Sequence, residues 1–277
     1  MKLRATALLV GLLASGCGPS DDTPAAPERF GLARTVAEID LVRKAIEAAN
    51  AVLAADAESS VITLDTGTIP GPREIPVLIL SATNLSKSDV IWVPPRCRCV
   101  YIQAPAIRRW LDRVRAAHGY GDPFDEKYLL SFMLLHELGH IARGVDGAYL
   151  GGEGSAVNME GNDAKATETA ADAFALAALQ RKLHGGGMHA QTAQEIVNNI
   201  KIASNNIYFA NTLSQSLAEI LCLNPSLYWD MGYSHPNLVF RLMKTVDILA
   251  PSTETTKIIS TYAECRNKTP DYFDKLN

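Results

Sequence analysis

The sequence predicts an α+β fold that is mainly helical, with a small mixed sheet ahead of the helix that carries the candidate site. Between residues 61 and 104, short β-branched and aromatic runs alternate with Pro, Gly, Asn and Ser, which is the pattern of short strands. On either side of this segment, apolar residues recur at helical spacing. The chain has 277 residues, enough for one domain with a sizeable core.

Residues 1–17 have the composition of a secretory signal. Two basic residues precede an apolar stretch from Ala5 to Ala14 that is too short to span a bilayer as a helix. The small residues before Cys17 resemble the cleavage box of bacterial lipoproteins, except that Ala14 stands where this box usually has Leu. We expect Cys17 to be the lipidated first residue of the mature protein. The alternative is ordinary signal cleavage nearby, with Cys17 discarded or left free.

Residues 18–29 form a predicted flexible tether, because a segment rich in Pro, Asp and small residues cannot bury enough apolar surface to fold. The folded domain is expected over residues 30–277. A lipid anchor on such a tether holds a domain beside a membrane, so we expect a protein of the bacterial cell envelope that faces the periplasm. Gly18 provides no inner-membrane Asp signal, and the resemblance to enteric lipoproteins therefore favours the outer membrane.

The composition is that of an ordinary soluble domain. A net charge of −4 gives no support for nucleic-acid binding. Polar residues are too frequent in the segment 191–223 for a membrane span, and we expect no transmembrane helix in the mature chain.

The expected elements follow one another simply along the chain. A helix over residues 30–56 precedes four strands, and two helices follow them, the second ending at Gly144. A Gly-rich segment from Val145 to Asn162 is either a mobile lid or a plain connection. The expected strands are residues 61–64, 77–80, 90–93 and 100–103, the two helices are 104–117 and 123–143, one or two more helices cover 191–223, and a loop covers 224–236.

The segment from Leu134 to His140 carries the strongest functional signal. Its sequence, Leu-Leu-His-Glu-Leu-Gly-His, continues an apolar run that begins after a typical helix start at residues 122–123. On a helix, His136 and His140 project from one face, so that their imidazoles can hold a single metal ion. Glu137 lies beside them and can take a proton from a water at an open metal position. The alternative is a pair of core histidines in an amphipathic helix.

A second segment, residues 167–175, supplies a third ligand. Glu168 and Asp172 recur at helical spacing with Ala175 and Leu179, so the two carboxylates share a face with residues that pack against the core. Carboxylates on a buried face need a partner. We expect Glu168 to be the third ligand of one Zn²⁺ ion and Asp172 to accept a hydrogen bond that orients a ligand imidazole.

Two alternatives to this ligand set stay open. The carboxylates of residues 167–175 can instead form the solvated face of an Ala-rich helix. Glu153 and Glu160, in the Gly-rich segment, are rival third ligands. We prefer Glu168, because a rigid helix holds a ligand better than a loop does.

These motifs bear a family resemblance. His-Glu-Leu-Gly-His at residues 136–140, Glu-x-x-Ala-Asp at 168–172 and Ser-His-Pro at 234–236, with Arg241 after it, resemble the gluzincin-like zinc endopeptidases of the CAAX-prenyl-protease, HtpX and BepA type. The resemblance covers sites between residues 136 and 241 and implies a zincin-like domain. The transmembrane helices of that family are absent, which makes its soluble periplasmic members the closer comparison. A phage-exclusion peptidase of the Lit type is a possible relative.

The resemblance implies roles for two further residues and for one strand. His235 is expected near the active site as a catalytic donor to the oxyanion, with Arg241 in the surrounding shell. Alternatively, His235 only caps the next helix, Arg241 is a surface charge, or Tyr228 or Tyr233 is the donor. Zinc peptidases of this class bind substrate backbone along an edge strand, and the strand at 100–103 is the expected edge.

Four cysteines beyond Cys17 predict two disulfides, since even numbers of cysteines in an exported chain usually pair. Three pairings are open. We prefer links from each of the two close cysteines to a distant one, because a bridge across two residues of an extended segment is strained. The four candidates are Cys97, Cys99, Cys222 and Cys265.

The function predicted from the sequence is a zinc metalloendopeptidase that hydrolyses peptide bonds in envelope proteins, with Glu137 as general base. Its partners are a protein or peptide substrate and a membrane reached through the lipid anchor. The alternative is a catalytically weak or latent zinc-binding lipoprotein that acts as an envelope assembly or interaction module. A third possibility is a zinc hydrolase that acts on an amide other than protein.

Overall fold

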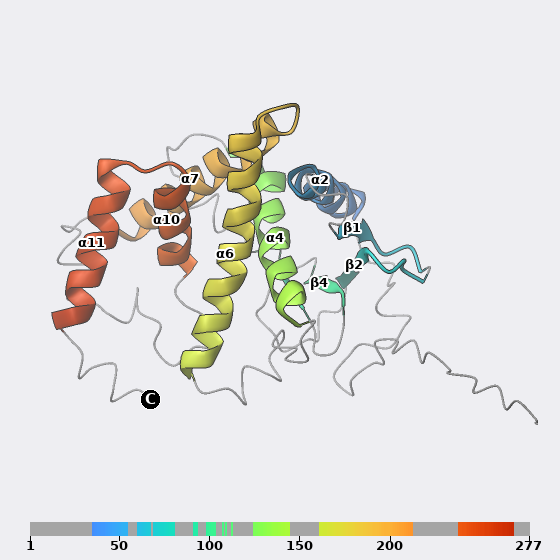
Figure 1. Ribbon diagram of the computed structural model, residues 1–277, viewed down its shortest axis with the longest axis horizontal. Helices are drawn as coiled ribbons and strands as arrows, with labels where there is room; N and C mark the ends of the chain where they lie inside the picture. Colours follow the sequence, from blue (N-terminus) through green and yellow to red (C-terminus); the bar gives the residue numbers. More distant parts are fainter. Residues whose placement is uncertain are drawn as a thin grey trace, which may run out of the picture.

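The structure is a computed structural model, and it describes residues 35–54, 60–67, 69–80, 91–93, 98–103, 107, 109, 112, 124–144, 161–212 and 238–268. Figure 1 shows the sheet and α2 on one side of α4, with the remaining labelled helices on the other side. In chain order the elements are α2 (Val36–Leu53), β1 (Val61–Leu64), β2 (Glu74–Leu80), β3 (Ile91–Trp92), β4 (Val100–Gln103), α4 (Glu126–Gly144), α6 (Gly161–Gly185), α7 (Ala190–Thr212), α10 (Leu238–Leu249) and α11 (Thr253–Lys268).

The predicted fold class is confirmed at the level of a mainly helical α+β architecture with a small mixed sheet. The strands at 61–64 and 100–103 have the predicted bounds, and α4 ends at Gly144 as predicted. Of the predicted helix at 104–117, the structure describes Ile107, Arg109 and Asp112, each with helical backbone. None of the described helices combines the length and the apolar character that crossing a membrane requires.

The sheet has the strand order β1-β2-β4-β3. The first three strands in this order are parallel, and β3 pairs antiparallel with β4. The prediction that residues 100–103 form the edge strand is therefore wrong, because β4 has neighbours on both sides. The reason is local: β3 and β4 follow each other through a short connection, which favours antiparallel pairing, and β3 takes the side of β4 that β2 leaves open.

The outer side of β1 is partly closed by an asparagine from α2. The side-chain amide of Asn50 donates to the carbonyl oxygen of Ile62 over 2.8 Å, and the backbone nitrogen of Ile62 donates to Asn50 Oδ1 over 2.9 Å. The side chain thus pairs with Ile62 as a neighbouring strand would, which satisfies backbone groups at the edge of the sheet.

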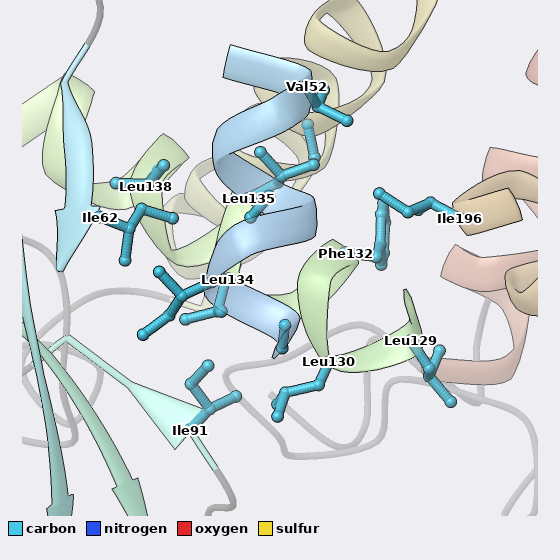
Figure 2. Close-up of a cluster of buried hydrophobic side chains, with 14 of the residues drawn as sticks. Val52, Ile62, Ile91, Leu129, Leu130, Phe132, Leu134, Leu135, Leu138 and Ile196 are labelled. Carbon is cyan, nitrogen blue, oxygen red and sulfur yellow. The ribbon is translucent and has the colours of Figure 1, made fainter. Parts of the chain in front are cut away.

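Helix α4 lies at the centre of the core. It packs against α2, α6 and α7 and also contacts β3. Figure 2 shows Leu134 and Leu138 near Ile62 of the sheet, while Phe132 lies beside Ile196 of α7. A helix that is apolar on nearly all sides must be buried, and α4 is therefore enclosed by the rest of the fold. Its few polar residues are held in this apolar surrounding.

Specific residues mark the helix ends. Thr35 caps α2, since its hydroxyl accepts from the backbone nitrogen of Glu38 and the Glu38 carboxylate accepts from the backbone nitrogen of Thr35. Helix α6 ends at Gly185, directly before two further glycines. Gly186 and Gly187 have φ angles of 65° and 83°, values that glycine adopts without strain.

Cys99 is buried directly before β4 and is disulfide-bonded. The side chains of the other three candidates, Cys97, Cys222 and Cys265, lie outside the described residues.

The Asn50 bridge predicts a measurable effect on stability. Asn50→Ala leaves the two edge groups of Ile62 without their partner, and we expect the free energy of unfolding to fall by about 1–2 kcal/mol. Gln194→Ala is the control, because the Gln194 amide donates to Asn198 in an exposed hydrogen bond, and its effect should stay below about 0.5 kcal/mol. Urea unfolding of both variants measures the difference, and equal small losses would contradict a structural role for Asn50.

Candidate metal centre

Three buried side chains converge where α4 meets α6. The Nε2 atoms of His136 and His140 lie 3.0 Å apart. Each of them lies 3.2 Å from a carboxylate oxygen of Glu168. The two imidazole rings are almost perpendicular, at 88°. The three residues therefore form a compact group of ligand atoms that can hold a metal ion.

The spacing of these atoms fits a small four-coordinate ion. Bonds of about 2.0–2.1 Å in a tetrahedral arrangement, as zinc forms with nitrogen and oxygen, place the ligand atoms about 3.3–3.4 Å apart. Three contacts in the centre lie close to that value. The two Nε2 atoms are 3.0 Å apart, His136 Nε2 lies 3.2 Å from Oε2 of Glu168, and His140 Nε2 lies 3.2 Å from the other oxygen, Oε1. Two imidazoles and one carboxylate are also a ligand set that leaves a coordination position for water.

Helical geometry explains why these side chains meet. His136 and His140 are four residues apart on α4, and Glu168 and Asp172 are four residues apart on α6, so that each pair lies on one face of its helix. The two faces meet, which brings both carboxylates to the histidines. Residues 28 positions apart in the chain thus become neighbours through one packing contact between two helices.

Asp172 orients the first histidine. His136 Nδ1 lies 2.9 Å from Asp172 Oδ1. With the proton assigned to Nδ1, this ring donates to the carboxylate, and its Nε2 lone pair faces Glu168, His140 and, at 3.2 Å, Nη2 of Arg241. The structure therefore places Asp172 where its predicted role requires it.

Arg241 reaches the same site from α10. Its Nε and Nη2 atoms each donate to a different oxygen of Asp172 over 2.7 Å, which is a bidentate ion pair. Its Nη1 atom lies 3.0 Å from Glu168 Oε2. Arg241 thus contacts both carboxylates of α6. The alternative interpretation of Arg241 as a surface charge does not agree with this placement.

Burial and charge together set the protonation of the centre. Burial lowers the pKa of His136, but hydrogen bonds to Asp172 and Glu168 outweigh it and raise that pKa to about 9. Burial would raise the pKa of Glu168, yet the hydrogen bonds from both histidines hold it well below its usual value. For Asp172, burial is likewise outweighed by Arg241 and His136, which lower its pKa.

Glu137 differs from the other two carboxylates. It is 7% exposed, and burial raises the pKa of its carboxyl above the ordinary value, although the two neighbouring histidines oppose this shift. A raised pKa lies closer to neutral pH, and a general base is most effective when its pKa is near the working pH.

The surroundings of the His140 ring fit a proton or a metal ion shared with His136. Within the described part of the chain, its buried Nδ1 has no hydrogen-bond partner. Its Nε2 faces that of His136 at 3.0 Å, and two unprotonated ring nitrogens so close together repel each other. A proton or a metal ion shared by the two rings removes this repulsion.

Sequence reasoning missed the contact that brings the two helices together. A Cβ atom on Gly139 would lie 2.7 Å from the Cα atom of Ala171 and 2.8 Å from its carbonyl oxygen. The available signal was a glycine inside a helix, which costs stability unless packing requires it.

Several predicted site residues lie outside the described residues. They are the donor candidates His235, Tyr228 and Tyr233, the rival ligands Glu153 and Glu160, and the lipidation candidate Cys17.

Comparisons with models of protein families, with curated proteins and with solved structures give no match to this chain. The functional assignment therefore depends on the residues of the centre and their geometry.

The raised pKa of His136 predicts that metal binding releases a proton. Below pH 9 the metal-free His136 ring is protonated, and a metal ion that binds Nε2 must displace that proton. We expect the apparent zinc affinity to rise about tenfold per pH unit until about pH 9. Calorimetry in buffers of different ionisation enthalpy counts the protons released, and a pH-independent affinity would contradict the shift.

The same shift predicts a pH dependence of the metal-free fold. The folded pKa of about 9 exceeds the unfolded value of 6.5, so the stabilisation is complete below pH 6.5 and is lost as the pH rises through 9. Asp172→Asn removes a main cause of the shift, and its unfolding free energy should vary less over this range. Denaturant unfolding in the presence of a chelator tests both variants.

Proposed function

We propose that the protein is a zinc-dependent endopeptidase with a zincin-like catalytic domain, which hydrolyses peptide bonds in proteins of the bacterial envelope. The observation that carries the proposal is the meeting of His136, His140 and Glu168 at ligand spacing, with Glu137 next to them in the same buried turn. The residues would hold one Zn²⁺ ion.

The chain's own residues supply the proton transfers. Bound zinc supplies a Lewis acid that polarises a carbonyl and acidifies water. Glu137 accepts the proton of the water that attacks the peptide carbonyl, and its raised pKa suits this task. The carboxyl group then donates this proton to the leaving amine as the C–N bond breaks. Asp172 keeps His136 oriented throughout.

Substrate backbone would add to the edge of the sheet at β3. β4 is internal, and Asn50 closes part of the β1 edge. β3 lies at the other end of the sheet and contacts α4, the helix with both histidines. A peptide paired with β3 would therefore lie along a strand that contacts the helix of both histidines.

The remaining parts of the proposal rest on the sequence. A lipid on Cys17 and the tether after it would place the domain in the periplasm, with the outer membrane favoured. His235 would donate to the oxyanion, with Tyr228 or Tyr233 as the alternative donor. In the sequence, His235 precedes Leu238, the first residue of α10, by three residues.

One observation favours a second candidate function. His136, Glu137, His140 and Glu168 are each at most 8% exposed, so a substrate carbonyl needs a rearrangement to reach them. A latent or weakly catalytic zinc lipoprotein, acting as an envelope assembly or interaction module, would keep such a centre closed. A zinc hydrolase for another amide would use the same residues.

Glu137→Gln separates catalysis from metal binding. We expect the variant to bind one zinc per chain and to lose about 10²–10⁴-fold in cleavage of an unfolded casein substrate, because the amide cannot accept the proton. Glu47→Gln, on the exposed side of α2, is the matched control and should keep full activity. Zinc binding without cleavage by the parent protein would favour the latent lipoprotein, and activity retained by Glu137→Gln would exclude Glu137 as the base.

His235→Ala tests the oxyanion donor. We expect kcat to fall about 10²–10³-fold while the zinc content stays at the parent value. His184→Ala, an exposed histidine near the end of α6, should change neither quantity. Parallel loss of zinc and activity in His235→Ala would show that His235 maintains the metal centre instead.

A further inference from the structure

Helices α4 and α6 approach each other closely at Gly139. A Cβ atom there would meet the Cα atom of Ala171 at 2.7 Å, its carbonyl oxygen at 2.8 Å and the Cβ atom of Phe174 at 3.1 Å. The two nearest atoms belong to the backbone, which cannot rotate away as a side chain can. Any side chain on Gly139 therefore requires the two helices to move apart.

This contact is surrounded by the residues of the metal centre. Gly139 directly precedes His140 and follows His136 by three residues, and Ala171 has the same relation to Asp172 and Glu168. All four polar residues thus lie within about one helical turn of the contact. A change in the distance between the helices at this point therefore shifts these four residues by almost the same amount.

The three contacts among the proposed ligands depend on different parts of the structure. The contact of 3.0 Å between the two histidines lies within α4, so the geometry of one helix sets it. The two contacts of 3.2 Å, from His136 to Oε2 and from His140 to Oε1 of Glu168, cross from α4 to α6. They depend on the distance between the helices, and therefore on the contact of Gly139 with Ala171.

Glu168 has little freedom to compensate for a displaced helix. Its carboxylate is buried and is held by Arg241 Nη1 at 3.0 Å. A metal site tolerates deviations of about 0.2 Å in its bond lengths. To bring a new Cβ atom at 2.7 Å from the Cα atom of Ala171 to an ordinary van der Waals distance, the helices must move by more than this.

We propose that Gly139 and Ala171 are positioning residues that set the distance from Glu168 to the two histidines, and so fit the centre to a small ion held by four ligands. The proposal rests on the metal centre of the proposed function but not on peptidase activity. It makes the glycine part of the metal site, although it has no side chain and binds no ion.

The expected sign of a substitution separates this proposal from the ordinary behaviour of glycine. Inside a helix, Gly is less favourable than Ala by about 0.5–1 kcal/mol, so Gly139→Ala would stabilise α4 if nothing lay opposite. With Ala171 at 2.7 Å, we expect weaker zinc binding instead.

The experiment compares Gly139→Ala with Leu130→Ala. We expect Gly139→Ala to lose about 10–100-fold in zinc affinity, as is usual when support of a ligand is lost. Its Co²⁺ form should show weaker visible absorption bands, because more than one water molecule would take the place of Glu168 and the coordination number would rise. Leu130 lies more than one turn before His136 and is buried in the core. Leu130→Ala should lower stability but keep the zinc affinity and the Co²⁺ spectrum of the parent.

Each outcome bears on the proposal. A folded Gly139→Ala variant with the zinc affinity and Co²⁺ spectrum of the parent would overturn it. If Gly139→Ala does not fold, Ala171→Ser adds a single oxygen on the facing helix, and unchanged metal binding there would equally overturn it. Failure of the parent to cleave casein while it binds zinc would remove the peptidase function and leave this proposal standing.

Discussion

The burial of ionisable groups at one helix crossing is the constraint on which the rest of the structure depends. A buried charge is unfavourable unless an opposite charge or a metal ion compensates it. At the crossing of α4 and α6, the carboxylates of Glu168 and Asp172 face His136 and the guanidinium of Arg241. Each group needs the others, so α10 must approach α6 to deliver Arg241. Three helices are thereby held in one mutual arrangement.

The apolar surroundings of α4 serve this centre directly. Enclosure by α2, α7 and the sheet excludes water from the helix, which strengthens each charge interaction and raises the pKa of Glu137. The same enclosure restricts the approach of a substrate. The burial that makes Glu137 an effective base therefore also fits a latent centre. Only cleavage by the parent protein distinguishes the two functions.

Local patterns were enough to predict much of the fold and the members of the centre. The strands at 61–64 and 100–103, the end of α4 at Gly144 and the spacing of His136 with His140 all follow from short-range sequence. The position of β4 inside the sheet did not, because it depends on pairing with the two-residue strand β3. The contact of Gly139 with Ala171 was not predicted either. The sequence of a helix shows which residues share a face, but it does not show how close the neighbouring helix comes.

Long-range contacts also determine what an ion would do for the fold. Two of the three proposed ligands belong to α4, which the sheet and α2 already hold, whereas Glu168 belongs to α6. An ion would therefore add a link across the helix crossing, and its binding energy would contribute to the packing of α6 on α4. Arg241 supplies the corresponding link from α10 through Glu168 and Asp172. An ion held by α4 and the arginine of α10 would contact the same carboxylate, so Glu168 is the residue at which metal binding would be coupled to helix packing.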